Sequence, residues 1–121
     1  FARLMQRHDY NVTIDEIHHT QKKDAPSGTA ITLAEGILKH IKRKTQWVNH
    51  ETQQAHELVI RSFRKDPVPG THTVKYQSSI DEIEIKHTAH SRQGFALGAI
   101  LVAEWLPVQK GVLGMDEFIK L

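Results

Sequence analysis

The sequence predicts an α+β fold in which helices cover one face of a mixed, largely antiparallel sheet. Several segments alternate apolar and polar side chains with the period of two that is typical of strands. One long segment repeats its apolar residues at helical spacing, and a later segment is apolar almost all round. The expected order of elements is therefore helix, strand, helix, three strands and helix.

The N-terminal part is expected to form the end of a helix followed by a strand. Residues 1–8 have a helical pattern that turns Leu4 and Met5 toward the interior. Residues 11–17 then alternate between apolar and polar side chains, which predicts a strand with one buried face. This strand ends where the polarity rises sharply, at a pair of histidines.

The clearest helix follows a polar loop and begins near Ser27. The hydroxyl of this serine can accept a hydrogen bond from a backbone amide one turn into the helix, as N-cap residues do. Glu35 and Lys39 belong to the polar face. The apolar positions fit the helical series without a gap: Ala30, Leu33, Ala34, Ile37, Leu38 and Ile41.

Three more strands are expected over residues 57–64, 71–77 and 81–88. A turn rich in proline and glycine separates the first two, and a pair of serines separates the last two. Successive alternating strands joined by short turns favour an antiparallel stretch with one solvent-exposed face. Residues 45–55, which precede these strands, are polar and irregular, with Trp47 as the main apolar anchor.

The last expected helix, residues 94–106, is apolar nearly all round and must be covered on most sides. One small domain offers limited cover, so we expect this helix to contact a surface outside the chain. Pro107 ends the helix, because proline cannot continue its hydrogen bonds. A short turn and a helix tail follow over residues 111–121, with Asp116 as a candidate N-cap.

Composition limits the classes of protein that this chain can represent. Its 121 residues are one domain's worth, and the start at Phe1 has no signal-peptide layout, so a cytoplasmic fragment is expected. No window approaches the roughly 18 apolar residues of a membrane span, and the absence of cysteine excludes disulfides. The net charge of +2 suits a solvated surface or a small anionic substrate. The basic run 39–44 has no interleaved aromatic residues, so nucleic acid is not an expected partner.

Three chemical features are compressed into residues 16–30. His18 and His19 stand at the end of a strand, and imidazole can donate a proton near neutral pH. Lys22 and Lys23 follow and can place an ammonium group against a carboxylate. Residues 27–29 open a helix, where unpaired amides and the helix dipole favour an anion and a glycine allows close approach. Each feature alone is ordinary, but together they predict a site for a small acidic molecule that receives a proton.

This segment also carries a family resemblance. The run Glu16-Ile17-His18-His19-Thr20-Gln21-Lys22-Lys23-Asp24-Ala25-Pro26-Ser27-Gly28-Thr29-Ala30 resembles the dihydrodipicolinate reductase signature E-x-H-H-x-x-K-x-D-A-P-S-G-T-A at every fixed position. The resemblance continues through residues 69–74, 84–89 and 91–99, so it covers the whole chain.

The resemblance implies the C-terminal part of a two-domain enzyme. Residues 1–91 would form its substrate-binding and tetramerisation domain, and residues 92–121 a helical segment that packs on a Rossmann domain absent from this chain. That absent domain would bind NADH or NADPH, since the present sequence has no G-x-G-x-x-G after a strand. No cofactor-binding residue is therefore expected here, and the fragment alone is expected to be inactive.

The resemblance further implies an NAD(P)H-dependent oxidoreductase that reduces a cyclic dicarboxylate in the diaminopimelate route to lysine, working as a cytoplasmic homotetramer joined through the sheet. His18 would be the acid that protonates the substrate, with Lys22 assisting. The residues that would hold the two carboxylates are His19, Lys22, Ser27, Gly28 and Thr29.

Other interpretations remain open from the residues alone. The chain could be a non-catalytic oligomerisation module or a small-anion-binding module. A metal site is not expected, because there is no His-Glu-x-x-His motif and no cysteine. Arg92 begins the segment that leads to the absent domain, and it could be a hinge residue, a tetramer contact or a substrate contact.

Overall fold

A mixed five-stranded sheet with a long helix along one face forms the first part of the chain. The computed structural model describes residues 1–119 and divides into two units, Phe1–His90 and a second unit from Ser91 onward. The first unit contains α1 (Ala2–Met5), β1 (Asn11–His18), α2 (Gly28–His40), β2 (Gln46–Val48), β3 (Glu57–Arg64), β4 (Gly70–Gln77) and β5 (Glu82–Ala89). The second contains α3 (Gln93–Trp105), a 3-10 turn (Leu106–Val108) and α4 (Met115–Ile119).

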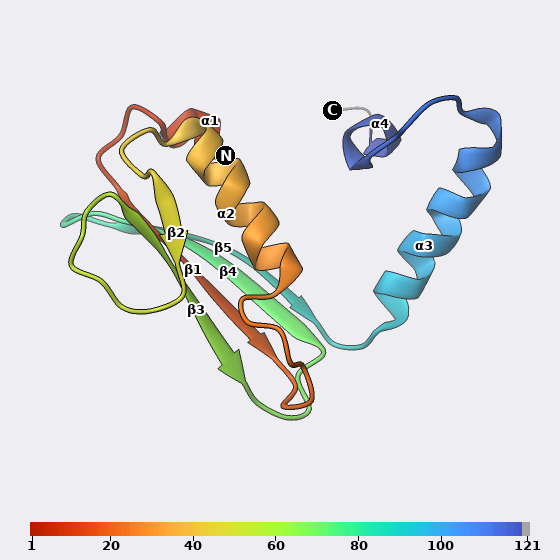
Figure 1. Ribbon diagram of the computed structural model, residues 1–121, viewed down its shortest axis with the longest axis horizontal. Coiled ribbons are helices and arrows are strands. Elements are labelled where there is room, and N and C mark those ends of the chain that lie inside the picture. The colour runs from red at the N-terminus through yellow and green to blue at the C-terminus, as the bar shows by residue number, and fades with distance from the viewer. Residues whose placement is uncertain (120–121) are drawn as a thin grey trace. The chain divides into compact units, whose positions relative to one another are not determined.

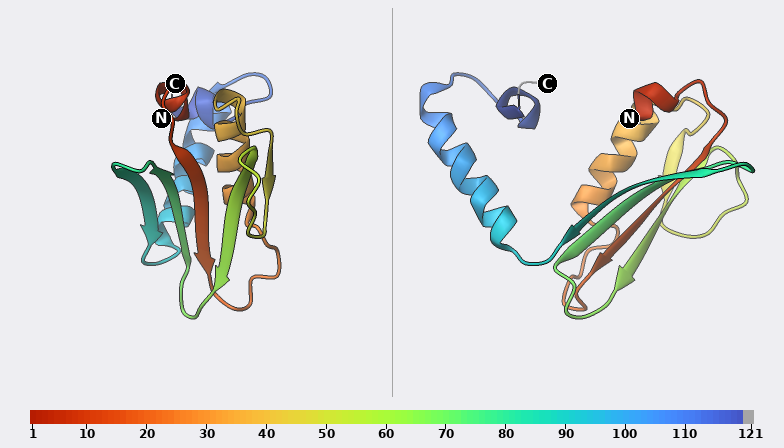
Figure 2. Two further views of the ribbon diagram at one scale, coloured as in Figure 1. Left: turned by 90° about the vertical axis from the view of Figure 1, so that its left-hand side faces the viewer. Right: turned by 180° about the vertical axis from the view of Figure 1, so that it is seen from behind.

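The strands lie in the order β2-β3-β1-β4-β5, as Figures 1 and 2 show. The pairs β2–β3 and β3–β1 are parallel, and the pairs β1–β4 and β4–β5 are antiparallel. The predicted α+β class and mixed sheet are confirmed. The expected antiparallel stretch of three successive strands is correct only for β4 and β5, because β1 lies between β3 and β4. The chain crosses from β1 to β3 through α2, which is how parallel neighbours are joined.

The core lies between α2 and one face of the sheet (Figure 1). Alternate residues of each strand point to this face, so Ile14 of β1 stands beside Ile60 of β3 and Val74 of β4. The fully or almost fully buried members are Val12, Ile14, Ala30, Ala34, Ile37, Ile41, Leu58, Ile60 and Tyr76. The predicted helical series therefore supplies one wall of the core, and the predicted strand alternation supplies the other.

Two local expectations were wrong or incomplete. In α1 only Met5 is buried, at 6% exposure, whereas Leu4 is 68% exposed. Neighbouring helical residues point about 100° apart, so a helix of four residues can turn Met5 into the core while Leu4 faces outward. The short strand β2 was not predicted, because Trp47 and Val48 are too few residues to show a period.

α2 begins as the sequence indicates. Ser27 has an extended backbone, and its Oγ accepts a hydrogen bond from the amide of Ala30 at 3.2 Å. The helix ends at His40, and Ile41 closes the last turn through a bond from its amide to the carbonyl of Ile37. The N-terminal end of α2 is thereby fixed at the same end of the sheet as the last residues of β1.

The second unit is helical throughout its regular elements. Pro107 lies in the 3-10 turn that follows α3, in agreement with its predicted role as the end of that helix. Asp116 lies in the first turn of α4 and is not its N-cap; instead Glu117 accepts a bond from the amide of Gly114 at 2.7 Å. The end of the expected helix tail, Lys120 and Leu121, lies outside the described residues. Within residues 1–119, no helix is both long and apolar enough to cross a membrane.

Candidate functional site

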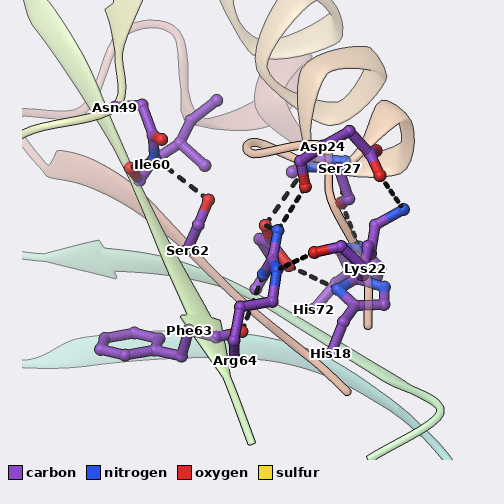
Figure 3. A network of polar contacts seen from close by, with 12 residues as sticks. His18, Lys22, Asp24, Ser27, Asn49, Ile60, Ser62, Phe63, Arg64 and His72 are labelled. Atoms are coloured by element: carbon purple, nitrogen blue, oxygen red, sulfur yellow. Dashed lines mark hydrogen bonds and ion pairs between the residues drawn. The ribbon is translucent and has the colours of Figure 1, made fainter. Parts of the chain in front are cut away.

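The candidate site lies where several elements meet at one end of the sheet. β1 ends at His18, β3 ends at Arg64, β4 begins at Gly70, and α2 begins at Gly28. His18 is paired in register with Arg64, and Glu16 is paired with His72. Because strand side chains alternate, these four side chains share the face that α2 covers. Figure 3 shows His18, Arg64, Ser27 and His72 converging there, whereas Phe63 points away.

Glu16 is the centre of this network and is completely buried. Both guanidinium nitrogens Nη1 and Nη2 of Arg64 donate to its two carboxylate oxygens at 3.0 Å. Nδ1 of His18 lies 2.5 Å from its Oε2, and the amide of Ser27 donates to its Oε1 at 3.2 Å. Burial alone would raise the pKa of Glu16, but hydrogen bonds from Arg64, Ser62 and His18 outweigh it and lower that pKa. Glu16 is therefore a buried carboxylate that stays ionised.

Arg64 also fixes the loop between β1 and α2. Its guanidinium donates to the backbone carbonyl of Lys22 at 3.2 Å and to that of Asp24 at 2.5 Å. The Nζ of Lys22 lies 2.9 Å from Oδ1 of Asp24, and this bond lowers the pKa of the Asp24 carboxyl group. The Lys22 ammonium therefore stands in a loop of fixed shape, with its side chain about a quarter exposed at 23%.

His72 connects the end of β1 to the start of α2. Its ring packs edge to face against the ring of His18, with centroids 5.1 Å apart, and its Nε2 lies 2.9 Å from Oγ of Ser27. Burial, and then the positive charge of His18, lower the pKa of His72. Gly70 borders the same rings, since a Cβ at that position would approach Nε2 of His18 to 3.1 Å.

The first turn of α2 presents backbone amides to the solvent. Gly28 and Thr29 are both exposed, and within residues 1–119 no acceptor is in hydrogen-bonding position for either amide. A Cβ at Gly28 would meet no atom within 4 Å, so there is open space beside the first residue of α2. Unpaired amides at the positive end of a helix dipole form a surface that suits an anion.

The structure brings most of the predicted site residues together. His18, Lys22 and Ser27 belong to one polar network, and Gly28 and Thr29 follow Ser27 as the first two residues of α2. His19 lies beside a different turn, because its charge contributes to the lowered pKa of Asp66 between β3 and β4. The loop there is held by Thr20, which donates through its amide and its hydroxyl to Asp66 at 3.0 and 2.5 Å.

Sequence reasoning missed three members of this network: Glu16, Arg64 and His72. The signal was present in the alternation itself. Glu16 has the same parity on β1 as Val12 and Ile14, so a carboxylate was due to be buried there and needed a cationic partner. Arg64 could be identified as that partner only through the pairing of β1 with β3.

Neither a metal site nor a dinucleotide site is found among the described residues. No group of three or more histidine, aspartate or glutamate side chains within residues 1–119 could hold a metal ion. The loop from β1 to α2, residues 19–27, contains no glycine, so it lacks the glycine-rich turn that cradles a pyrophosphate. The arrangement instead places an imidazole and an ammonium group beside the open amides of a helix, which suits a small anionic molecule.

Comparison with known proteins gives a consistent result. Residues 1–119 match the family described as dihydrodipicolinate reductase, C-terminus. The 4-hydroxy-tetrahydrodipicolinate reductase of Christiangramia forsetii is 53% identical over 119 residues, which are 98% of this chain and 49% of that protein. The protein of the same name from Methanosarcina acetivorans is 41% identical over 116 residues, or 93% of this chain and 44% of that protein. The chain thus spans about half the length of these relatives.

A solved structure shares the fold. The dipicolinate-bound dihydrodipicolinate reductase from Paenisporosarcina sp. TG-14 superposes with a TM-score of 0.71 at 24% identity, covering 97% of this chain and 48% of that one. The family match over nearly the full length and the identity to its named members agree with the signature around His18. This chain therefore belongs to the family of dihydrodipicolinate reductase C-terminal domains.

Proposed function

We propose that this chain is the substrate-binding part of a 4-hydroxy-tetrahydrodipicolinate reductase, which reduces a cyclic dicarboxylate in the diaminopimelate route to lysine. The observation that carries this proposal is the pair of open amides at Gly28 and Thr29 beside Lys22 and the His18 network. The relatives that bear this enzyme name match almost the whole chain. NADH or NADPH would supply the hydride from outside the described residues, which offer no cradle for it.

The carboxylates of the substrate would be held at the start of α2. Gly28 and Thr29 are exposed in the first turn of α2, where amides lack intrahelical partners, and the Lys22 ammonium adds a positive charge from the neighbouring loop. The Ser27 hydroxyl already accepts a bond from Ala30, so it can donate to a carboxylate only when His72 donates to it. His19, on the other side of the loop, would provide a further contact to the ligand.

The proton would come from His18, with Lys22 assisting. Imidazole can be protonated near neutral pH. When the hydride adds to one end of the substrate's double bond, the electron pair moves to the other end, and that other end takes the proton from the imidazole. General acid catalysis of this kind is worth about 10²–10⁴-fold in rate.

A chimera tests the proposal directly. Residues 1–119 replace the matching part of the Christiangramia forsetii protein, and oxidation of NADPH or NADH is followed with the dihydropyridine substrate. We expect turnover by the chimera and none by this chain alone. A chimera that folds and binds dipicolinate without turnover would instead indicate a non-catalytic anion-binding module.

The first prediction concerns the proton donor. In the chimera, His18→Gln should lower kcat by about 10²–10⁴-fold, because a proton donor acts mainly in the transition state. The dissociation constant for dipicolinate, measured by calorimetry, should change by less than about threefold, since the amides of α2 remain. His50→Gln, on an exposed loop, is the control. Equal kcat values for the parent and the His18 variant would refute the assignment.

We further propose a cytoplasmic homotetramer joined through the sheet face that α2 leaves uncovered. Val59 lies on that face, and Phe63 is 47% exposed there. Its other side chains are largely polar, which suits a hydrated interface. The second prediction is that light scattering will detect a tetramer of this chain at tens of micromolar, and that Phe63→Glu will dissociate it. A stable monomer at that concentration, or a dimer abolished by Phe95→Glu alone, would contradict assembly through the sheet.

A further inference from the structure

Glu16 cannot touch a substrate, because it is completely buried and its oxygens are occupied. Its partners are the guanidinium of Arg64, the amide of Ser27 and Nδ1 of His18. Of these, only His18 is the proposed proton donor. The contact with the imidazole of His18 is therefore the route by which Glu16 can act on proton transfer.

We infer that Glu16, held by Arg64, is a positioning residue that keeps the neutral His18 imidazole protonated on Nδ1, so that Nε2 is the atom that carries the transferable proton. This inference rests on the proposed function for its role in catalysis, but the protonation pattern can be measured without any activity.

The geometry at Nδ1 supports this assignment. An ionised carboxylate can only accept hydrogen bonds, so the nitrogen 2.5 Å from Oε2 of Glu16 must carry a proton in the neutral ring. The opposite tautomer would place two lone pairs against each other in a buried site, where such repulsion is poorly screened. The neutral imidazole therefore leaves Nε2 unprotonated, and protonation of the ring adds the second proton at Nε2.

The ring is also held from its other sides. Nε2 of His18 faces Gly70, where even a methyl group would approach to 3.1 Å, and the ring of His72 packs against it edge to face. The imidazole consequently has little room to flip and exchange its nitrogens. A side chain at position 70 would press on Nε2, and the ring would have to shift by a few tenths of an ångström to accommodate it.

Arg64 explains why the carboxylate keeps its charge. Its two hydrogen bonds to Glu16 oppose the effect of burial on that group. The charged and titratable groups near the pair of His18 and His72 are Glu16, Lys22 and His87, and Arg64 adjoins them through its bonds to Glu16. Glu16 is the anion in direct contact with the ring of His18, through Nδ1 at 2.5 Å.

The test uses nitrogen-15 NMR of the histidines in this chain and steady-state kinetics of the chimera. We expect the parent to show the Nδ1–H tautomer for neutral His18. Glu16→Gln should give a mixture of tautomers, because an amide can donate as well as accept. In the chimera, Glu16→Gln should lower kcat at least about tenfold, with the dissociation constant for dipicolinate changed by less than about threefold. Glu84→Gln, which removes a carboxylate paired with Lys75 at 3.1 Å on another strand, is the matched control.

Gly70→Ala is a second variant for the case in which Glu16→Gln does not fold. It leaves the pair of Glu16 and Arg64 intact while displacing the ring, so kcat should fall without loss of that pair. An Nε2–H tautomer in the parent, or full kcat in a folded Glu16→Gln variant, would overturn the inference. A chimera without activity would refute the proposed function, and the tautomer of the parent would then decide the positioning role by itself.

Discussion

The two long helices have the same length but differ in how much of their surface is buried. α2 and α3 each contain 13 residues. α2 buries Ala30, Ala34 and Ile37 against the sheet, whereas α3 buries no residue. The apolar side chains of α3 are about half exposed: Phe95 54%, Leu97 57%, Ile100 56% and Leu101 45%.

The difference shows that apolar content does not by itself bury a helix. α2 is amphipathic, so one sheet face satisfies its apolar stripe and its polar start is left open to form the site. α3 is apolar on several sides, and one neighbouring surface could not cover it. We therefore still expect α3 to contact a surface outside this chain, as its sequence predicts.

The largest expected effect is a difference in free energy of unfolding between two variants, one with an isoleucine of α2 replaced and one with an isoleucine of α3 replaced. Ile37→Ala should lower the free energy of unfolding of the first unit by about 2–5 kcal/mol, because Ile37 is 5% exposed and its loss leaves a cavity. Ile100→Ala should change the free energy of unfolding of the second unit by no more than about 0.5 kcal/mol, since Ile100 is 56% exposed.

Urea unfolding measures this difference when each unit has its own reporter. Trp47 packs on the core of the first unit and Trp105 contacts Phe118 in the second. Trp105→Phe therefore leaves Trp47 to report the first unit, and Trp47→Phe leaves Trp105 to report the second. All variants are compared at one protein concentration, because association shifts the apparent stability. Equal losses for the two isoleucine variants would mean that α3 packs as tightly as α2.

Replacing one glycine on each helix tests which of the two helices binds dipicolinate. Gly28→Val should weaken dipicolinate binding by at least about tenfold, because the new side chain fills the space above the first amides of α2. Gly98→Val on α3 is matched to it, since neither glycine has an atom within 4 Å of an added Cβ. Calorimetry with this chain gives both affinities. Unchanged affinity in the Gly28 variant would exclude the start of α2 as the carboxylate site.

The smallest expected effect is on the pH dependence of the free energy of unfolding, and it comes from His72, which contacts Ser27 at the start of α2. Because burial lowers the pKa of His72 in the folded chain, the unfolded chain takes up a proton first as the pH falls below about 6.5. The stability contributed by neutral His72 is therefore present above that pH and is lost as the pH falls through the folded pKa. His72→Gln should show a smaller loss of unfolding free energy between pH 7 and pH 5.

The groups that face His72 are Glu16 and His18 on β1, His87 on β5 and Lys22 in the loop, and all remain in the variant. His50→Gln, on the exposed loop before β3, serves as the control for removing one histidine. An unchanged pH dependence in His72→Gln would show that another group governs acid sensitivity. α3 starts beside an exposed stretch of chain and offers no comparable buried titratable neighbour within the described residues.

The sequence alone determined the elements whose periods are long and regular. The series from Ala30 to Ile41 predicted α2, and Ser27 predicted its start, because capping and helical spacing are local properties. The run from Glu16 to Ala30 also predicted where the proposed acid and the open amides would lie. The chemistry of this run could be assigned locally, because its functional groups lie on one loop and on the first turn of the helix that follows it.

Only the tertiary structure decided which residues complete the site. β1 pairs with β3 and β4, and that pairing brings Arg64 and His72 to Glu16 from 48 and 56 residues away in sequence. No local pattern encodes such a pairing, because it depends on how α2 crosses over the sheet and on the burial that several strands achieve together. The burial of Glu16 follows from that arrangement, and so does the strength of its bonds to Arg64 and His18, since a carboxylate removed from water must be satisfied by the protein.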